Sequence, residues 1–288
     1  MSGGNEATVM TRPPFTAGLL PDRAVLRVTG PEASNFLQGL LTADVAGLGP
    51  GQAAYGALLT PQGKILFDLF IFAHGGEFLI DCSAARRDEL LRKLSFYRLR
   101  AKVEIAASPL AVAVSPEEPS QPLHFADSRL ARLGWRALVE AGTMAAATSY
   151  DAARIEGGLA DSDADLAPGE FFPHEANFDQ FGGVSFSRGC YVGQEVVSRM
   201  EYRSTARSRI LPVTLARAAP APGTAILSGE KQVGTLLSAA GSQALALLRL
   251  DRLAEAKAPL LTENVSLTVR KPSFARYDVP GADKEADR

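Results

Sequence analysis

The residues best suited to chemistry lie in one short run at positions 188–195, Arg-Gly-Cys-Tyr-Val-Gly-Gln-Glu. Buried strands and helices repeat apolar residues with a period of about two or about 3.6, whereas this run mixes glycines, a thiol, a phenol, an amide and a carboxylate. It therefore indicates a site rather than a packed core. The residues after it can form a helix, so a helix N-terminus and the Arg188 cation would both favour a thiolate at Cys190.

The chain has two cysteines, and each has two interpretations. A free cysteine is commonly a small buried hydrophobe, and this interpretation is retained for Cys82, which ends an apolar strand. For Cys190 the surrounding run favours a reactive thiol over a packing role. Gln194 and Glu195 fall at the start of the predicted helix, and Gln194 is the better site candidate because it lies nearer the thiol.

This run resembles the Lys-Gly-Cys-Tyr-x-Gly-Gln-Glu signature of the YgfZ-like folate-binding proteins, which assist iron–sulfur cluster maturation. Arg188 stands where the family usually has lysine, a change that keeps the positive charge but replaces a compact ammonium with a planar group. Further resemblance lies in residues 60–68, 97–103, 154–158, 173–177 and 183–187, so it spans roughly residues 20–270.

The resemblance implies tetrahydrofolate or a derivative as cofactor, and iron–sulfur assembly or client proteins as partners. It implies Cys190 as the reactive group, with Arg188, Tyr191, Gln194 and Glu195 contributing to the folate site. YgfZ-like proteins are similar to the folate-binding T-protein, the aminomethyltransferase of the glycine cleavage system. That similarity implies two α+β units and a C-terminal barrel arranged as a cloverleaf around a central channel.

Asp68 lies inside an apolar strand predicted for residues 65–72, on the same face as Leu66, Phe70 and Phe72. A buried carboxylate needs a partner, so Asp68 is either a structural hydrogen-bonding group or an exposed edge residue. The resemblance adds a third role, as a catalytic group that faces the folate channel. T-protein-like enzymes typically carry two adjacent acidic residues here. This chain has Phe67-Asp68, which weakens the case for aminomethyl transfer.

Glu156 lies in Arg-Ile-Glu-Gly-Gly at residues 154–158, which matches the Arg-x-Glu-Ala-Gly pattern of T-protein. The resemblance implies that this glutamate hydrogen-bonds the pterin. A carboxylate suits a pterin edge because its two oxygens accept from neighbouring ring N–H and amino groups in one plane. The alternative is a solvated glutamate at a helix end.

Composition restricts the class of protein. With 288 residues, 46% hydrophobic and 22% charged, the chain is expected to be a soluble protein with two or three cores. A net charge of −2 without a basic stripe argues against nucleic-acid partners. Neither a signal-peptide core nor a run of about 18 apolar residues occurs, so no membrane association and a cytoplasmic location are expected.

Metal-binding spacings are also missing from the sequence. Two cysteines and three histidines form no CxxC or HxxxH pattern, so no metal site is predicted. A conventional iron–sulfur cluster takes about four cysteine ligands. The chain is therefore expected to assist cluster chemistry rather than to carry a cluster by itself.

The order of elements predicts an α+β fold with antiparallel sheets and a small C-terminal β-barrel. Strands are expected at 24–29, 53–59, 65–72, 78–82, 102–106 and 135–140, helices from 30, at 84–98 and at 149–157, and a surface excursion at 115–128. Short strands from residue 210 onward form the expected barrel. The expected units are residues 15–107, 108–205, which carry the cysteine run, and 206–275, followed by a tail at 276–288.

Three functions remain open at this point. The first is a tetrahydrofolate-binding factor that assists assembly or repair of iron–sulfur clusters through Cys190. The second is a folate-dependent aminomethyltransferase that carries out one-carbon transfer. The third is a folate-binding scaffold in which Cys190 only packs.

Overall fold

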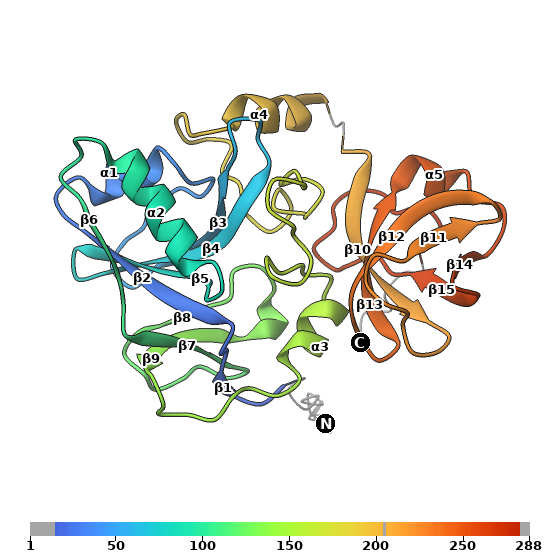
Figure 1. Cartoon of the computed structure of the whole chain (residues 1–288), viewed down its shortest axis with the longest axis horizontal. Helices are drawn as coiled ribbons and strands as arrows, with labels where there is room; N and C mark the ends of the chain where they lie inside the picture. Colours follow the sequence, from blue (N-terminus) through green and yellow to red (C-terminus); the bar gives the residue numbers. More distant parts are fainter. Residues whose placement is uncertain (1–14, 204–205, 283–288) are drawn as a thin grey trace, which may run out of the picture.

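The computed structural model describes residues 15–203 and 206–282. Two antiparallel sheets lie one above the other on the left of Figure 1, and a closed barrel lies to their right. The predicted α+β fold with a C-terminal barrel is therefore confirmed. Within the described ranges no helix is long and apolar enough to cross a membrane.

The first sheet has five strands in the order β3-β4-β5-β2-β6. Its strands are β2 (Arg23–Thr29), β3 (Ala53–Leu59), β4 (Ile65–His74), β5 (Glu77–Ser83) and β6 (Glu104–Ala107). Helices α1 (Ala33–Gln38) and α2 (Arg87–Arg98) pack on one face and share a core with it. In α2 the buried residues are Leu90 and Leu94, one turn apart, which explains the apolar spacing in the sequence.

Strand β4 presents its residues to two different cores. Phe67 and Leu69 join the core under the helices, whereas Phe70 and Phe72 join a larger core shared with the second sheet. The register of β3 and β4 shifts between Leu58 and Leu59. Because of such a bulge, strict alternation fails at the start of the strand. Leu66, expected on the same face as Phe70, therefore packs against the helix-side core instead.

The second sheet has four strands in the order β1-β7-β9-β8. They are β1 (Gly18–Leu19), β7 (Leu110–Ser115), β8 (His124–Ala126) and β9 (Trp135–Glu140), and the short helices η1 (Ala131–Leu133) and α3 (Tyr150–Glu156) belong to the same region. Strand β8 falls inside the segment predicted as a surface excursion. Three residues at a sheet edge are too few to give a periodic signal.

An irregular segment at residues 157–193 joins the parts of the molecule. In Figure 1 it runs between the sheets and the barrel and leads into α4 (Gln194–Arg203) at the top. Its aromatic rings pack on the first sheet: the ring centroids of Phe178 and Phe181 lie 4.9 and 5.7 Å from that of Tyr55. These contacts fix the segment that carries the cysteine run.

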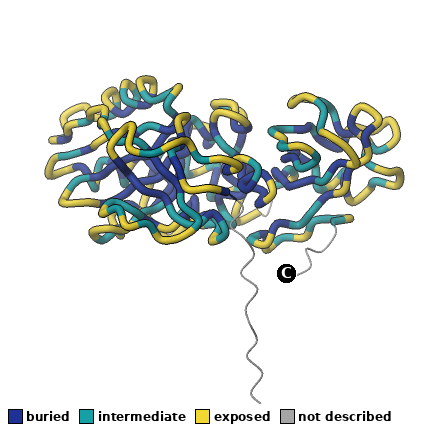
Figure 2. Tube along the Cα trace, turned by 90° about the horizontal axis from the view of Figure 1, so that it is seen from below, coloured by how far each residue is buried: buried dark blue, intermediate teal, exposed yellow. Residues whose placement is uncertain are grey.

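The barrel closes in the order β10-β13-β12-β11-β14-β15. Its elements are β10 (Ser208–Leu215), β11 (Ala225–Ser228), β12 (Lys231–Ala240), β13 (Gln243–Arg249), α5 (Leu250–Ala254), β14 (Leu260–Thr262) and β15 (Val265–Val269). It encloses an apolar core of its own. In Figure 2 buried residues follow the inner strands of both the sheet region and the barrel, while exposed residues gather at the turns. The unit bounds expected from the sequence stay predictions.

Candidate functional site

The two cysteines differ sharply in exposure. Cys190 is exposed in the loop before α4, whereas Cys82 on β5 is buried and only 1% exposed. Burial raises the pKa of the Cys82 thiol to about 12. Within the described chain, Cys190 is therefore the one thiol that solvent or another protein can reach.

Two glycines hold the Cys190 loop against the β3–β4 hairpin. Gly193 and Gly63 both have φ of +81°, a backbone region that favours glycine. A Cβ atom at residue 193 would lie 2.5 Å from the Thr60 carbonyl oxygen, and one at residue 63 would lie 3.1 Å from the Gly193 carbonyl oxygen. The cysteine run and the turn at residues 60–63, far apart in sequence, thus meet backbone to backbone.

Arg188 anchors the same loop to the segment after α1. Its Nη1 donates to the carbonyl oxygens of Leu41 and Ala43, and its guanidinium lies 4.9 Å from the centroid of the Tyr191 ring. Burial lowers the pKa of Arg188. The sequence suggested Arg188 as a partner of the Cys190 thiolate. In the structure Arg188 mainly holds the loop against the residues that follow α1.

The other residues expected at the folate site have different surroundings. Tyr191 is buried, burial raises its pKa to about 12, and its hydroxyl has no hydrogen-bond partner within residues 15–203 and 206–282. Gln194 is half-buried at the first position of α4. Glu195 faces solvent with its side chain 84% exposed and pairs with Arg199 at 2.7 Å. Tyr191 is thus buried, Gln194 is half-buried and Glu195 lies on the surface.

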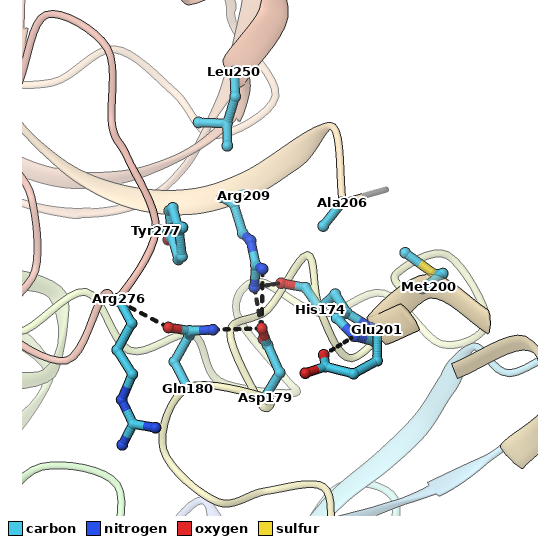
Figure 3. Close-up of a pocket in the computed structure, with 10 residues that line it drawn as sticks. All are labelled: His174, Asp179, Gln180, Met200, Glu201, Ala206, Arg209, Leu250, Arg276 and Tyr277. Atoms are coloured by element: carbon cyan, nitrogen blue, oxygen red, sulfur yellow. Dashed lines mark hydrogen bonds and ion pairs between the residues drawn. The ribbon is translucent and has the colours of Figure 1, made fainter. Parts of the chain in front are cut away.

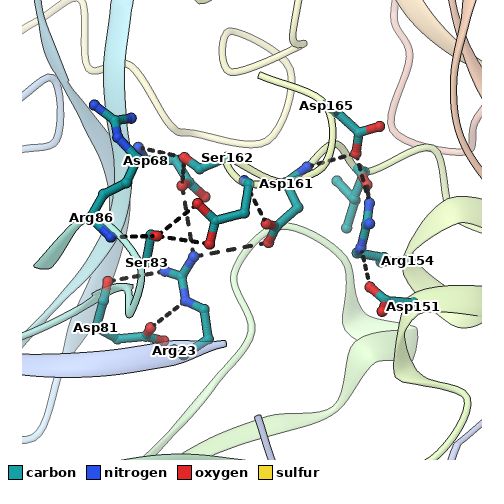
Figure 4. Close-up of polar contacts among 12 residues, drawn as sticks. Arg23, Asp68, Asp81, Ser83, Arg86, Asp151, Arg154, Asp161, Ser162 and Asp165 are labelled. Atoms are coloured by element: carbon teal, nitrogen blue, oxygen red, sulfur yellow. Dashed lines mark hydrogen bonds and ion pairs between the residues drawn. The ribbon is translucent and has the colours of Figure 1, made fainter. Parts of the chain in front are cut away.

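Asp68 is buried on β4, where Ser162 and Arg23 lie beside its carboxylate (Figure 4), and each of its two oxygens accepts a hydrogen bond from a protein group. The Tyr55 hydroxyl donates to its Oδ2 at 2.8 Å, and the Ser162 hydroxyl donates to its Oδ1. Arg23 Nη1 lies 3.7 Å from Oδ1. Burial, together with the Asp68 charge, raises the pKa of Tyr55, so the phenol stays a donor to the carboxylate.

Arg23 links Asp68 to a second buried carboxylate. Its Nε donates to Asp81 Oδ1 at 2.7 Å, and Arg136 Nε donates to Asp81 Oδ2 at 3.1 Å. Burial opposes the Arg23 charge, but Asp81 and Asp68 outweigh it and keep the pKa of Arg23 above its usual range. Sequence analysis missed Arg23, Asp81 and Ser162. The only local signal was the charge inside apolar strands.

Glu156 occupies a different environment from Asp68. It ends α3, it is exposed, and its Oε2 accepts from Arg132 Nη2 at 2.6 Å. It borders a narrow crevice between η1 and the barrel, where Arg270 donates to its backbone carbonyl at 3.0 Å. Among the described residues, none that bonds to the Glu156 side chain also bonds to Asp68. The structure therefore gives the two carboxylates separate surroundings.

Two parts of this chain match known family models, and relatives match most of its length. Residues 207–277 match the family model described as CAF17, C-terminal beta-barrel domain, and residues 23–113 match the GCVT N-terminal domain. Human iron-sulfur cluster assembly factor IBA57, mitochondrial, is 33% identical, with 84% of this chain and 78% of the relative covered. The Mus musculus protein of the same name is 32% identical, with 85% and 80% covered.

A solved structure is similar in fold. The glycine cleavage system aminomethyltransferase T from Bartonella henselae superposes with a TM-score of 0.73 at 16% sequence identity, over 92% of this chain and 87% of that one. At this identity the likeness concerns the fold alone.

The comparisons also correct one expectation. The sequence predicted a cytoplasmic location, but the human, mouse and Chaetomium globosum relatives are all named mitochondrial. The expectation of a cytoplasmic location was therefore wrong. It rested on the N-terminus, and residues 1–14 lie outside the described residues.

Proposed function

Because the chain belongs to the CAF17/IBA57 family of iron–sulfur cluster assembly factors, we propose that it acts in cluster assembly or repair through the Cys190 thiol. The observation that carries this proposal is the contrast between its two cysteines, one exposed in a rigidly held loop and one buried. The partners are other assembly proteins or the client proteins that receive a cluster.

The chemistry available to Cys190 follows from its position. A thiolate is a good ligand for iron and also a nucleophile, and an exposed loop presents it to a second protein. A conventional cluster takes about four cysteine ligands. One accessible thiol can supply only part of such a set, so the iron or cluster is cargo that another protein helps to hold.

The second part of the proposal is that tetrahydrofolate or a derivative binds to this chain. Its support is the fold shared with an aminomethyltransferase and the exposed Glu156 carboxylate, which can accept from a pterin edge if it exchanges its Arg132 partner. Calorimetry with tetrahydrofolate tests this part. Glu156→Ala should weaken binding, whereas Glu255→Ala, an exposed carboxylate paired with Lys231, should not. Equal affinity in the two variants would remove Glu156 from the site.

The proposed function does not use Asp68 for aminomethyl transfer. Asp68 is the carboxylate that would act in such a reaction, and Tyr55, Ser162 and Arg23 already surround it. The proposed role of this carboxylate is therefore to hold these neighbouring groups in one buried network.

Complementation tests the proposed role of Cys190. Cells lacking their own factor receive the wild type, Cys190→Ser or Cys82→Ala, and iron–sulfur enzyme activity is measured with expression and melting temperature. The exposed Cys190→Ser change should alter stability by no more than about 0.5 kcal/mol and still abolish rescue. Cys82→Ala leaves a small cavity in the core and should rescue at low temperature. Full rescue by Cys190→Ser would exclude a reactive thiol and leave a scaffold role.

A further inference from the structure

A second polar cluster lies away from the Cys190 loop, at the far end of α4. A cavity of about 320 Å³ opens there between residues 173–180, the last turn of α4, the start of β10 and Tyr277 (Figure 3). His174, Asp179 and Glu201 point into the same region, and Arg209 lies among them. The proposed function uses none of these side chains.

His174 has more binding capacity than the protein uses. Its side chain is only 2% exposed, and Nε2 lies 3.0 Å from Glu201 Oε2. Nδ1 is buried and has no hydrogen-bond partner in the described parts of the chain. Nε2 faces the Glu201 carboxylate and can therefore serve as a ligand beside it, because a neutral imidazole commonly binds a metal through one nitrogen.

Asp179 is held in place by hydrogen bonds, and its Oδ1 atom can still accept another contact. Arg209 donates to its Oδ1 at 2.6 Å and to its Oδ2 at 2.9 Å, and Gln180 donates to Oδ2 at 2.5 Å. Each carboxylate oxygen can accept about two hydrogen bonds, so Oδ1 keeps the capacity for another partner. Arg209 then serves as the outer group that orients a ligating carboxylate, as such groups do in metal sites.

We propose that His174, Asp179 and Glu201 form a binding site for a divalent transition-metal ion. Their ligand atoms all lie within 4.8 Å of one another. Tetrahedral coordination at about 2.0–2.1 Å places ligand atoms about 3.3 Å apart, so the cluster must contract slightly. Glu201 is 45% exposed and can make this movement by a change of rotamer.

The ligand types indicate which cation binds. The cavity also holds two cations, Arg209 and Arg276, so its selectivity rests on the ligand atoms rather than on a net charge. One imidazole with two carboxylates suits zinc or iron(II), whereas magnesium and calcium prefer oxygen ligands alone. Three protein ligands beside a cavity leave room for a water or a small anion, as in exchangeable rather than structural zinc sites.

Titration with zinc chloride in a Cys190→Ser background tests the site, because that background removes the accessible thiol as a competing ligand. Calorimetry should give one ion per chain. Glu201→Gln should weaken binding at least tenfold, or about 1.4 kcal/mol, while the matched surface variant Glu255→Gln should bind like its parent.

Cobalt(II) supplies a second readout, since the visible absorption of a tetrahedral cobalt complex should appear in the parent and disappear in Glu201→Gln. Glu201 is half-exposed on a helix, so this variant should fold and keep its melting temperature. Equal zinc affinity in Glu201→Gln and its parent would overturn the site. So would the absence of binding at millimolar zinc, or binding that requires Cys190.

Discussion

Replacing Asp68 with asparagine tests whether the Asp68 carboxylate has a structural or a catalytic role. Asparagine has nearly the same shape but no charge, and it keeps only one of the two acceptor oxygens. Its oxygen can still accept from Ser162 or from Tyr55, but not from both, and Arg23 loses one of its carboxylate neighbours. The change therefore weakens the buried network without opening a cavity.

The size of the effect follows from these contacts. A hydrogen bond to a charged group contributes about 1.5–3 kcal/mol, and asparagine replaces part of what is lost. Arg23 retains its close pair with Asp81 at 2.7 Å, so the cation is not left alone. The free energy of unfolding should therefore fall by about 2–3 kcal/mol. In a chain of this size the melting temperature should fall by about 4–12 °C.

The assay combines melting temperature with rescue of iron–sulfur enzymes in cells grown at low temperature. Asp68→Asn should melt lower yet still rescue, because the proposed chemistry resides at Cys190. Asp251→Asn, which breaks an exposed ion pair with Arg249, serves as the matched control and should change neither measurement. An Asp68→Asn protein with unchanged melting temperature and no rescue would refute the structural role and return Asp68 to the chemistry.

Two further predictions rest on the burial of Cys82 and on the charge of Asp161. Ellman's reagent at pH 8 should label one thiol per native chain, Cys190, because burial raises the pKa of Cys82 to about 12; two fast-reacting thiols would contradict this. Burial opposes the charge of Asp161, but Arg23 outweighs it and lowers the Asp161 pKa. Its contribution to stability is thus complete above about pH 4 and is lost as the pH falls through the lowered pKa. Melting curves of Asp161→Asn should approach wild type in acid, and a pH-independent difference would exclude this coupling.

The sequence correctly predicted those elements that depend only on a local pattern of residues. The alternation in 53–59 and 65–72 located β3 and β4, and the Pro-Gly turn between them predicted the hairpin. Alternation failed only where a bulge shifts the register, which moved Leu66 to the opposite core. A bulge depends on the pairing of two strands, so one strand's pattern does not reveal it.

The site residues also differ in how far the sequence could predict them. The mixed composition around Cys190 predicted a site, which stays a prediction, and the structure places this thiol exposed in a loop. The partners of Asp68 come from β2, β3 and the segment after α3, and no spacing rule connects residues so far apart. His174 and Glu201 are likewise 27 residues apart and meet only after α4 folds back on the loop before it.

The Cys190 loop contacts two other parts of the chain, the turn at residues 60–63 and the residues that follow α1. Gly193 touches the turn at residues 60–63 so closely that a Cβ atom would collide with the Thr60 carbonyl, and Arg188 donates to carbonyl groups beside α1. The thiol is thus positioned by the backbone of the first sheet rather than by its own segment. A change in the hairpin turn would displace Cys190 even though the turn carries no reactive group. The turn at residues 60–63 and the cysteine run therefore form one structural unit.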